Sequence, residues 1–160
     1  RKPDYDRFSV YFNMDNGSGK FRGIYTEGNV AVKSLFSEWF SPLSDLSEGT
    51  INANATGGTD HESFDNVGLP AFQFVQDPLD YTPRLHHTHV DSFDHVLPDD
   101  MRQAAVVMAT FAYEAAMAEN RVSRKPMPTA PSELEQQQEH EKAKKRQRVK
   151  ERKALSELPK

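Results

Sequence analysis

Histidine and aspartate are concentrated in one stretch of this sequence of 160 residues. Five of the six histidines fall between His61 and His95, and they are densest in the segment 85–94, LHHTHVDSFD. The aspartates that accompany them are Asp60, Asp65, Asp77, Asp80, Asp91 and Asp94. Imidazole and carboxylate groups are the usual ligands of zinc, and loops held by a rigid sheet are where such sites are built. The stretch therefore indicates either a metal site or a polar loop with surface histidines.

A second candidate ligand is Asp15, which directly follows the apolar run 8–14, FSVYFNM. A nearly continuous run of aromatic and β-branched residues favours a central strand that is buried on both faces. In open α/β sheets, ligands bind beyond the carboxyl ends of the strands, which is where Asp15 is expected to lie. Its carboxylate is thus either a metal ligand or an Asx-turn residue that shapes the loop 15–19.

The elements that must position these residues alternate between strand and helix. In chain order, the sequence predicts a strand at 8–14, a short extended piece at 21–26, a helix at 29–40, a strand at 50–54, one or two helical turns at 61–67, a strand at 70–75, a long loop at 77–97 and a helix at 98–119. This order favours an α/β fold with a mostly parallel sheet. Three strands are few for such a fold, and parallel strands need helices on both faces. We therefore expect half of a three-layer α/β/α sandwich.

Composition separates an acidic body from a basic tail. Residues 1–130 hold eleven Lys and Arg against eighteen Asp and Glu, a net charge of −7, whereas residues 131–160 carry +3. An acidic body argues against a dedicated nucleic-acid-binding domain. No apolar run approaches the ~20 residues of a membrane span, and the absence of cysteine excludes disulfides and thiolate-bound zinc.

The same composition predicts the domain organisation. We expect a folded body at 1–120, a proline-containing linker at 121–130 and a charged tail at 131–160 that is helical or disordered. The basic tail is interpreted as a solvated extension, with a nucleic-acid-binding arm as the alternative. The sequence begins with Arg1 rather than Met, so we expect a chain that has lost its beginning. A processed N-terminus is the alternative.

Three blocks of the sequence, taken in order, resemble one known family. They are FNMDN at 12–16, GGTDHESFDNVGLPAFQF at 57–74 and HHTHVDSFDHV at 86–96. Over roughly residues 5–120 the chain resembles the C-terminal half of the co-catalytic di-zinc exopeptidases, which include bacterial leucyl aminopeptidases, glutamate carboxypeptidase II and carboxypeptidase Q. The double histidine with a third histidine two places on is most like the carboxypeptidase Q branch.

The resemblance implies a role for each candidate residue. Asp15 matches a carboxylate ligand of one zinc, and His87 matches the imidazole ligand of the other. His86 falls where several relatives have a tyrosine that stabilises the tetrahedral intermediate, and an imidazole N–H could donate to that oxyanion in the same way. Asp60 and Asp91 are candidates for support of the ligands or for substrate contact, with loop capping as the alternative.

The resemblance also implies groups that this sequence does not contain. The family uses a further His, a bridging Asp and a Glu-Glu pair, all upstream of the strand that precedes Asp15. The first Glu of that pair is the general base. We therefore expect a full-length parent that hydrolyses dipeptides or short peptides with two zinc ions, while this chain alone is inactive. The alternative is a non-catalytic relative that acts as a binding or interaction domain.

The remaining expectations concern partners and location. The resemblance implies a peptide substrate, a possible homodimer of the parent and an exported protein, periplasmic or extracellular. No membrane span is expected, and nucleic acid is disfavoured as a partner.

Overall fold

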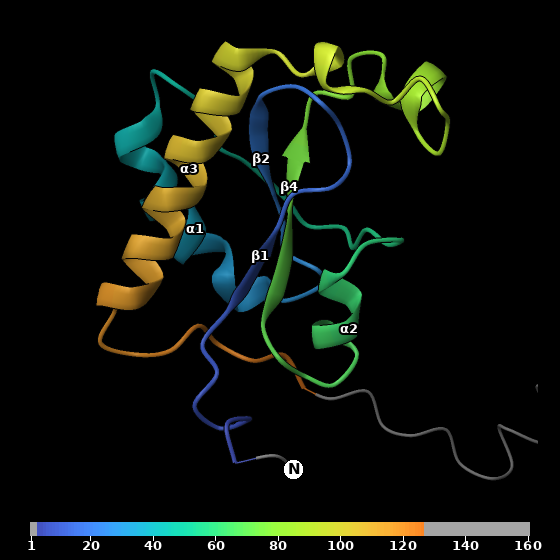
Figure 1. Cartoon of the computed structure of the whole chain (residues 1–160). Coiled ribbons are helices and arrows are strands. Elements are labelled where there is room, and N and C mark those ends of the chain that lie inside the picture. The colour runs from blue at the N-terminus through green and yellow to red at the C-terminus, as the bar shows by residue number, and fades with distance from the viewer. Residues whose placement is uncertain (1–2, 127–160) are drawn as a thin grey trace, which may run out of the picture. The chain divides into compact units, whose positions relative to one another are not determined.

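The computed structural model describes residues 3–126, in which four strands form one sheet in the order β1-β4-β2-β3 (Figure 1). The strands are β1 (Tyr11–Asn13), β2 (Phe21–Tyr25), β3 (Thr50–Asn52) and β4 (Ala71–Gln76). β1 pairs with β4 and β2 pairs with β3 in parallel, whereas β2 and β4 run antiparallel. The predicted α/β class with a mostly parallel sheet is confirmed.

Helices lie on both faces of this sheet. The α-helices are α1 (Lys33–Phe40), α2 (His61–Asp65) and α3 (Pro98–Met117), and the other helical turns are η1 (Val30–Val32), η2 (Ser41–Leu43), η3 (Tyr81–Leu85) and η4 (Phe93–His95). α1 and α3 cover one face, while α2 packs against β1 and β4 on the other (Figure 1). In the part of the chain that the structure describes, no helix is both long and apolar enough to cross a membrane.

β2 corrects the predicted strand count. The sequence indicated three strands and a short extended piece at 21–26, but that piece is a full strand between β4 and β3. The loop from β1 is held on β4, because Gly19 N donates to Asp77 O at 2.9 Å and Asp77 N donates to Lys20 O at 2.9 Å. So short a connection cannot return the chain to the starting end of the sheet, which a parallel strand requires. β2 therefore runs antiparallel to β4.

β1 also differs from its prediction as a central strand buried on both faces. Among the described residues it lies at an edge of the sheet, and Tyr11 and Phe12 are only half-buried. It is shorter than the apolar run 8–14 because Phe8 leaves the ladder and stacks on Phe64 of α2, with ring centroids 5.4 Å apart.

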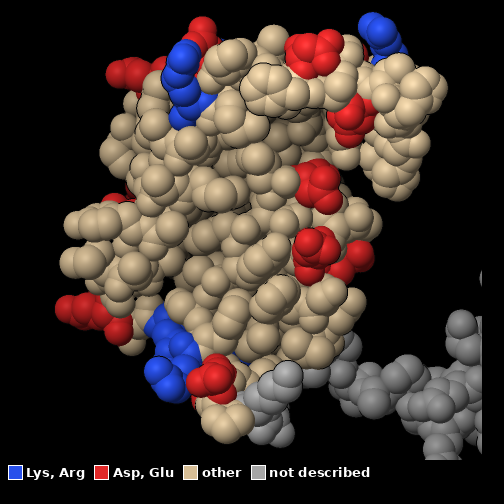
Figure 2. All heavy atoms as spheres, in the orientation of Figure 1, with Lys and Arg blue, Asp and Glu red and all other residues tan. Residues whose placement is uncertain are grey.

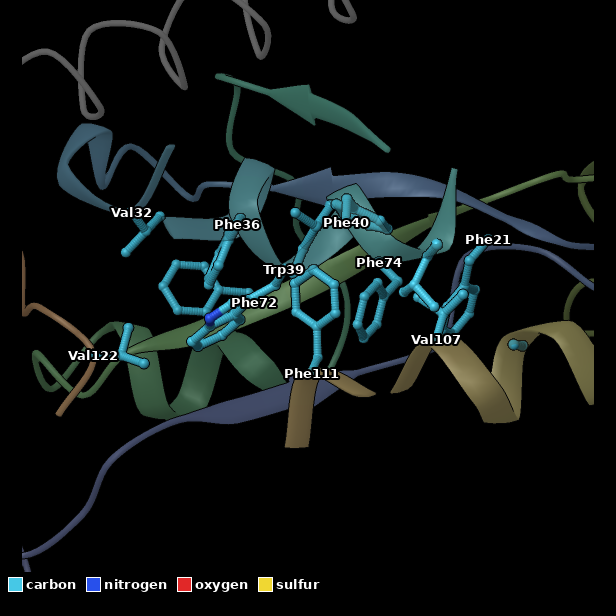
Figure 3. Packing of buried hydrophobic residues seen from close by; sticks show 13 residues of the cluster. Phe21, Val32, Phe36, Trp39, Phe40, Phe72, Phe74, Val107, Phe111 and Val122 are labelled. Carbon is cyan, nitrogen blue, oxygen red and sulfur yellow. The ribbon is translucent and has the colours of Figure 1, made fainter. Parts of the chain in front are cut away.

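The core between the sheet and the α1–α3 layer is mainly aromatic. Phe111 of α3 is fully buried, and its ring lies 4.6 Å from that of Phe40 and 5.3 Å from that of Phe74 (Figure 3). Phe36 of α1 meets Phe72 edge-on at 4.8 Å. Rings at these distances and angles add to the stabilisation from burial of apolar area. This packing fixes β4, and the loops of the candidate site lie at its C-terminal end.

Residues 121–126, the described part of the expected linker, are packed onto the body. Val122 is buried in the core, and Asn29 Nδ2 donates to Ser123 O at 2.7 Å. Arg124 Nη2 donates to Tyr5 O at 2.6 Å, and Lys125 Nζ donates to Asp65 Oδ2 at 2.6 Å. The predicted tail at 131–160 lies outside the described residues.

Candidate functional site

Asp15 lies two residues beyond the end of β1, in the loop that crosses the end of β4. The loop is anchored by its neighbour, because Asn16 Oδ1 accepts a hydrogen bond from Gln76 N and Asn16 N donates to Gln76 Oε1, both at 3.2 Å. Asp15 is exposed, and within residues 3–126 its carboxylate accepts no hydrogen bond. The loop-shaping role therefore belongs to Asn16, and the Asp15 carboxylate remains available to a ligand.

His86 and His87 follow η3, the helical turn that leads out of β4. Leu85 anchors this turn in the core, being 1% exposed, while both histidines are exposed. His87 has a backbone φ of +60°, which turns the chain back so that its ring stacks on that of His86 with centroids 3.8 Å apart. The His86 ring lies 5.1 Å from that of Tyr81. The three rings form one cluster, which we call the Tyr81–His86–His87 cluster.

Asp15 and this cluster lie in one neighbourhood although 66 residues separate Asp15 from Tyr81. The pKa of Tyr81 is raised above its ordinary value, first by burial and then by the negative charges of Asp15 and Asp91. Because β1 and β4 are parallel neighbours, the loops that follow them start at the same edge of the sheet. The roles of Asp15 and the histidines as metal ligands remain predictions.

The surroundings of these loops are acidic. In Figure 2, acidic side chains gather along the side of the molecule that carries α2 and the loop after β4. A surface rich in negative charge attracts cations. Among residues 3–126, no group of three or more His, Asp or Glu side chains is placed to hold a metal ion. The two predicted ligands are therefore not joined by a third from the described part of the chain.

The two supporting aspartates occupy separate positions. Asp60 is exposed at the start of α2, and its side chain makes no capping hydrogen bond. Asp91 is exposed in the histidine loop and acts electrostatically on Tyr81. His95 closes that loop, since its Nδ1 lies 3.1 Å from Asp80 Oδ2. His95 is thus a structural residue of the loop.

Sequence reasoning missed a buried polar network under the sheet. His61 and Glu27 are 1% and 2% exposed, and His61 Nε2 lies 3.4 Å from Glu27 Oε1. Further members are Thr59 and the fully buried Gln73 of β4. The one available signal was the glutamine inside the apolar strand 70–75, because a polar residue in a buried strand needs partners.

Comparison with known proteins identifies the family to which this chain belongs. Residues 1–112 match peptidase family M28, so the chain belongs to that family. A crystal structure of a peptidase M28 precursor from Shewanella amazonensis SB2B is similar in fold, with a TM-score of 0.64 and 26% identity, over 79% of this chain and 28% of that one. The prediction of family membership is confirmed.

Within the family, similar curated proteins include carboxypeptidase Q of several mammals. The protein from Rattus norvegicus is 27% identical over 123 residues, which is 77% of this chain and 26% of that protein. The protein from Mus musculus is 26% identical over 115 residues, which is 72% of this chain and 24% of that protein. The chain spans about a quarter of the length of these relatives. The expected likeness to the carboxypeptidase Q branch is confirmed.

Proposed function

We propose that this chain supplies Asp15 and His87 as ligands to a di-zinc exopeptidase site. One observation carries the proposal. The exposed carboxylate of Asp15 follows β1, and the loop that carries the stacked His86 and His87 follows the neighbouring parallel strand β4, so both start at the same edge of the sheet. Membership of a peptidase family and similarity to carboxypeptidase Q support the same conclusion.

The donor groups fit zinc in their chemistry. A free carboxylate and an exposed imidazole are hard and intermediate ligands that zinc binds at about 2.0–2.2 Å. When bound, two zinc ions supply a Lewis acid and an activated water. The other ligands and the general-base glutamate come from outside residues 1–160 in this proposal. Asp15 and His87 contribute charge and orientation from two rigid supports, β1 and the loop anchored by Leu85.

His86 is the residue of this chain proposed to act on the reacting carbonyl. Its ring is held between Tyr81 and His87, at 5.1 Å and 3.8 Å. A ring N–H fixed in this way donates to the oxygen that becomes negatively charged in the transition state. Asp91, on the same loop, is proposed to orient His87, and Asp60 to support the ligands or the substrate.

The substrates are proposed to be unblocked dipeptides or the ends of short peptides. The acidic side of the molecule in Figure 2 is compatible with the free amino group of such a substrate as well as with metal cations. The protein is proposed to act outside the cytoplasm, as an exported enzyme. A homodimer of the parent and an arm-like role for the basic tail stay predictions.

The experiment uses the full-length protein that contains this chain. D15N keeps the shape of the side chain and removes its charge, so zinc content and hydrolysis of Ala- and Leu-containing dipeptides should both fall. The matched control is D45N, because Asp45 is also exposed but lies in the turn after η2. If D15N keeps its full zinc content and rate, Asp15 is not a ligand.

This chain alone is proposed to be inactive on the same dipeptides, because two ligands cannot complete two zinc sites of about four ligands each. Robust hydrolysis by purified residues 1–160 would contradict this. A full-length protein that binds no zinc and hydrolyses none of these substrates would instead favour the non-catalytic relative.

A further inference from the structure

The loop that carries Asp15 is fastened to Gln76, the last residue of β4. Gln76 is 8% exposed, and its side-chain amide bonds two successive residues of the loop. Its Oε1 accepts a hydrogen bond from Asn16 N at 3.2 Å, and its Nε2 donates to Gly17 O at 2.9 Å. The backbone N–H of Gln76 donates in turn to Asn16 Oδ1 at 3.2 Å. We call these three hydrogen bonds the Gln76 clamp, and a buried amide bonded in this way is held in one orientation.

The same loop packs so closely on the end of β4 that side chains would not fit at two of its positions. A Cβ at Gly17 would lie 2.6 Å from Asp77 O, and a Cβ at Gly19 would lie 2.7 Å from the Cβ of Asp77. Glycine permits this close approach of one backbone to another. A larger residue at Gly17 would therefore push the loop away from the strand and open the Gln76 clamp.

The clamp leaves Asp15 and one neighbour between two fixed points of the backbone. On the N-terminal side, Asn13 faces Gln73 in the β1–β4 register, and its Nδ2 donates to Gln73 Oε1 at 2.7 Å. On the C-terminal side, Asn16 is held by Gln76. Asp15 is exposed, yet the chain on either side of it is tied to the same strand. The position of its carboxylate is therefore set by β4 and not by the loop alone.

The next residue, Asp77, ties the start of the histidine loop to the Asp15 loop. Gly19 N donates to Asp77 O and Asp77 N donates to Lys20 O, both at 2.9 Å. Arg22 of β2 holds the side chain, since its Nε donates to Asp77 Oδ2 at 2.8 Å. The two loops that carry the proposed zinc ligands are thus joined at one junction, where β4 ends.

We propose that Gln76 is a positioning residue, whose side-chain amide holds the Asp15 carboxylate in place to bind zinc together with the ligand from the histidine loop. In this role Gln76 touches neither the metal nor the substrate and acts only through Asp15. The effect on zinc rests on the proposed function, whereas the clamp itself does not. A ligand that is held in place before the metal arrives binds more tightly, and loss of a residue that orients a ligand costs about 10–100-fold in metal affinity.

The clamp is tested first in the 160-residue chain without metal, by hydrogen exchange of the Asn16 amide followed by NMR. Q76M keeps the approximate size of the buried side chain and removes both of its hydrogen bonds to the loop. Exchange at Asn16 should become about tenfold faster, because its N–H loses the oxygen that it bonds.

The matched control is Q103M in α3. Gln103 is 7% exposed, and its amide also bonds backbone groups, but these belong to Phe21 and Leu46. Q76M and Q103M therefore remove the same kind of buried hydrogen bond from two different places. Q103M should leave the exchange rate at Asn16 within about threefold of the wild type.

The second measurement is the zinc affinity of the full-length protein that contains this chain, by competition with a chelator. Q76M should weaken zinc binding by about tenfold or more, and Q103M by less than about threefold. In the D15N background, Q76M should add less than about threefold, because the carboxylate that it positions is already gone.

The outcomes separate this proposal from the proposed function. Gln76 is not a positioning residue if Q76M leaves Asn16 exchange or zinc affinity unchanged, if Q103M matches Q76M in either measurement, or if Q76M weakens zinc binding equally with and without D15N. Wild-type zinc affinity in D15N alone would instead show that Asp15 is not a ligand, which overturns the proposed function and the role of Gln76 together.

If Q76M does not fold, G17A tests the same clamp from the side of the loop. An alanine Cβ at this half-buried position would press on Asp77 O and push the loop away, while Gln76 stays in place. G17A should give the same faster exchange at Asn16 and the same loss of zinc affinity. Wild-type values for G17A in both measurements would overturn the proposal.

Discussion

The rings of His86 and His87 stack with centroids 3.8 Å apart, although the two residues are adjacent in the chain. The contact exists because His87 has a φ of +60°, in the left-handed region that non-glycine residues seldom occupy. Such strain persists where the surrounding structure holds it, and here Thr88 Oγ1 donates to Leu85 O at 2.7 Å beside a buried Leu85. The two imidazoles are therefore presented as a fixed pair.

The first prediction compares His87 with His89 in the full-length protein. If His87 binds zinc, H87A should lower kcat/KM for dipeptides by about 100-fold or more and reduce the zinc content. H89A should change both by less than about threefold, because His89 is exposed on the same loop without an assigned ligand role. Equal losses in the two variants at unchanged zinc content would show that the wrong histidine was chosen.

The second prediction separates His86 from its neighbour. H86A should lower kcat by about 100-fold while zinc content stays at the wild-type level, because an oxyanion donor is lost and no ligand is. H86Y should restore much of the rate, since a phenol O–H can donate to the same oxygen. A kcat for H86A within a few-fold of wild type would remove His86 from the reaction.

Most of the fold could be predicted from local patterns. The apolar stripe of α3 and the apolar run of β4 appear in the sequence because burial requires them. β2 was underestimated because Phe21-Arg22-Gly23 carries no strand pattern. Gly23 is nonetheless required there, since a Cβ at this position would lie 1.9 Å from Thr50 O of β3. Pairing between β2 and β3 depends on residues far apart in the chain, so a local sequence pattern does not reveal it.

The residues of the candidate site could likewise be predicted from the sequence only in part. Asp15 and the histidine loop could be predicted from residue types, because a carboxylate after an apolar run and a cluster of imidazoles can be recognised in the amino-acid sequence. Glu27 could not, because Glu-Gly after a strand is typical of an exposed turn. Only the packing of α2 against the sheet buries it beside His61.

The third prediction concerns the aromatic core. F111A removes a fully buried ring that contacts both α1 and β4, so the free energy of unfolding should fall by about 3–5 kcal/mol. Y113A, on the exposed side of the same helix, should change it by less than about 1 kcal/mol. Urea unfolding of the 160-residue chain, followed by tryptophan fluorescence of Trp39, measures both. Similar losses in the two variants would mean that α3 is not packed as described.

The fourth prediction concerns the pH dependence of stability. Because the folded-state pKa of Glu27 is raised, the native state binds its proton more tightly than the unfolded state does. The contribution of Glu27 to stability is therefore fully present below the unfolded pKa of about 4.3 and is lost as the pH rises through the folded pKa. At neutral pH the buried carboxylate is a net cost.

E27Q carries no ionisable group, so its free energy of unfolding should rise relative to wild type as the pH increases from about 4.3 through the folded pKa, and then level off. E38Q should follow the wild type across the same range, because Glu38 is exposed. Parallel urea titrations of the three proteins at closely spaced pH values give these differences. A gap between E27Q and wild type that stays constant with pH would mean that Glu27 titrates equally in the folded and unfolded chains, and a gap that shrinks would mean that it is ionised more easily when folded. Either result would contradict a buried, proton-holding Glu27, whereas a widening gap is what its burial requires.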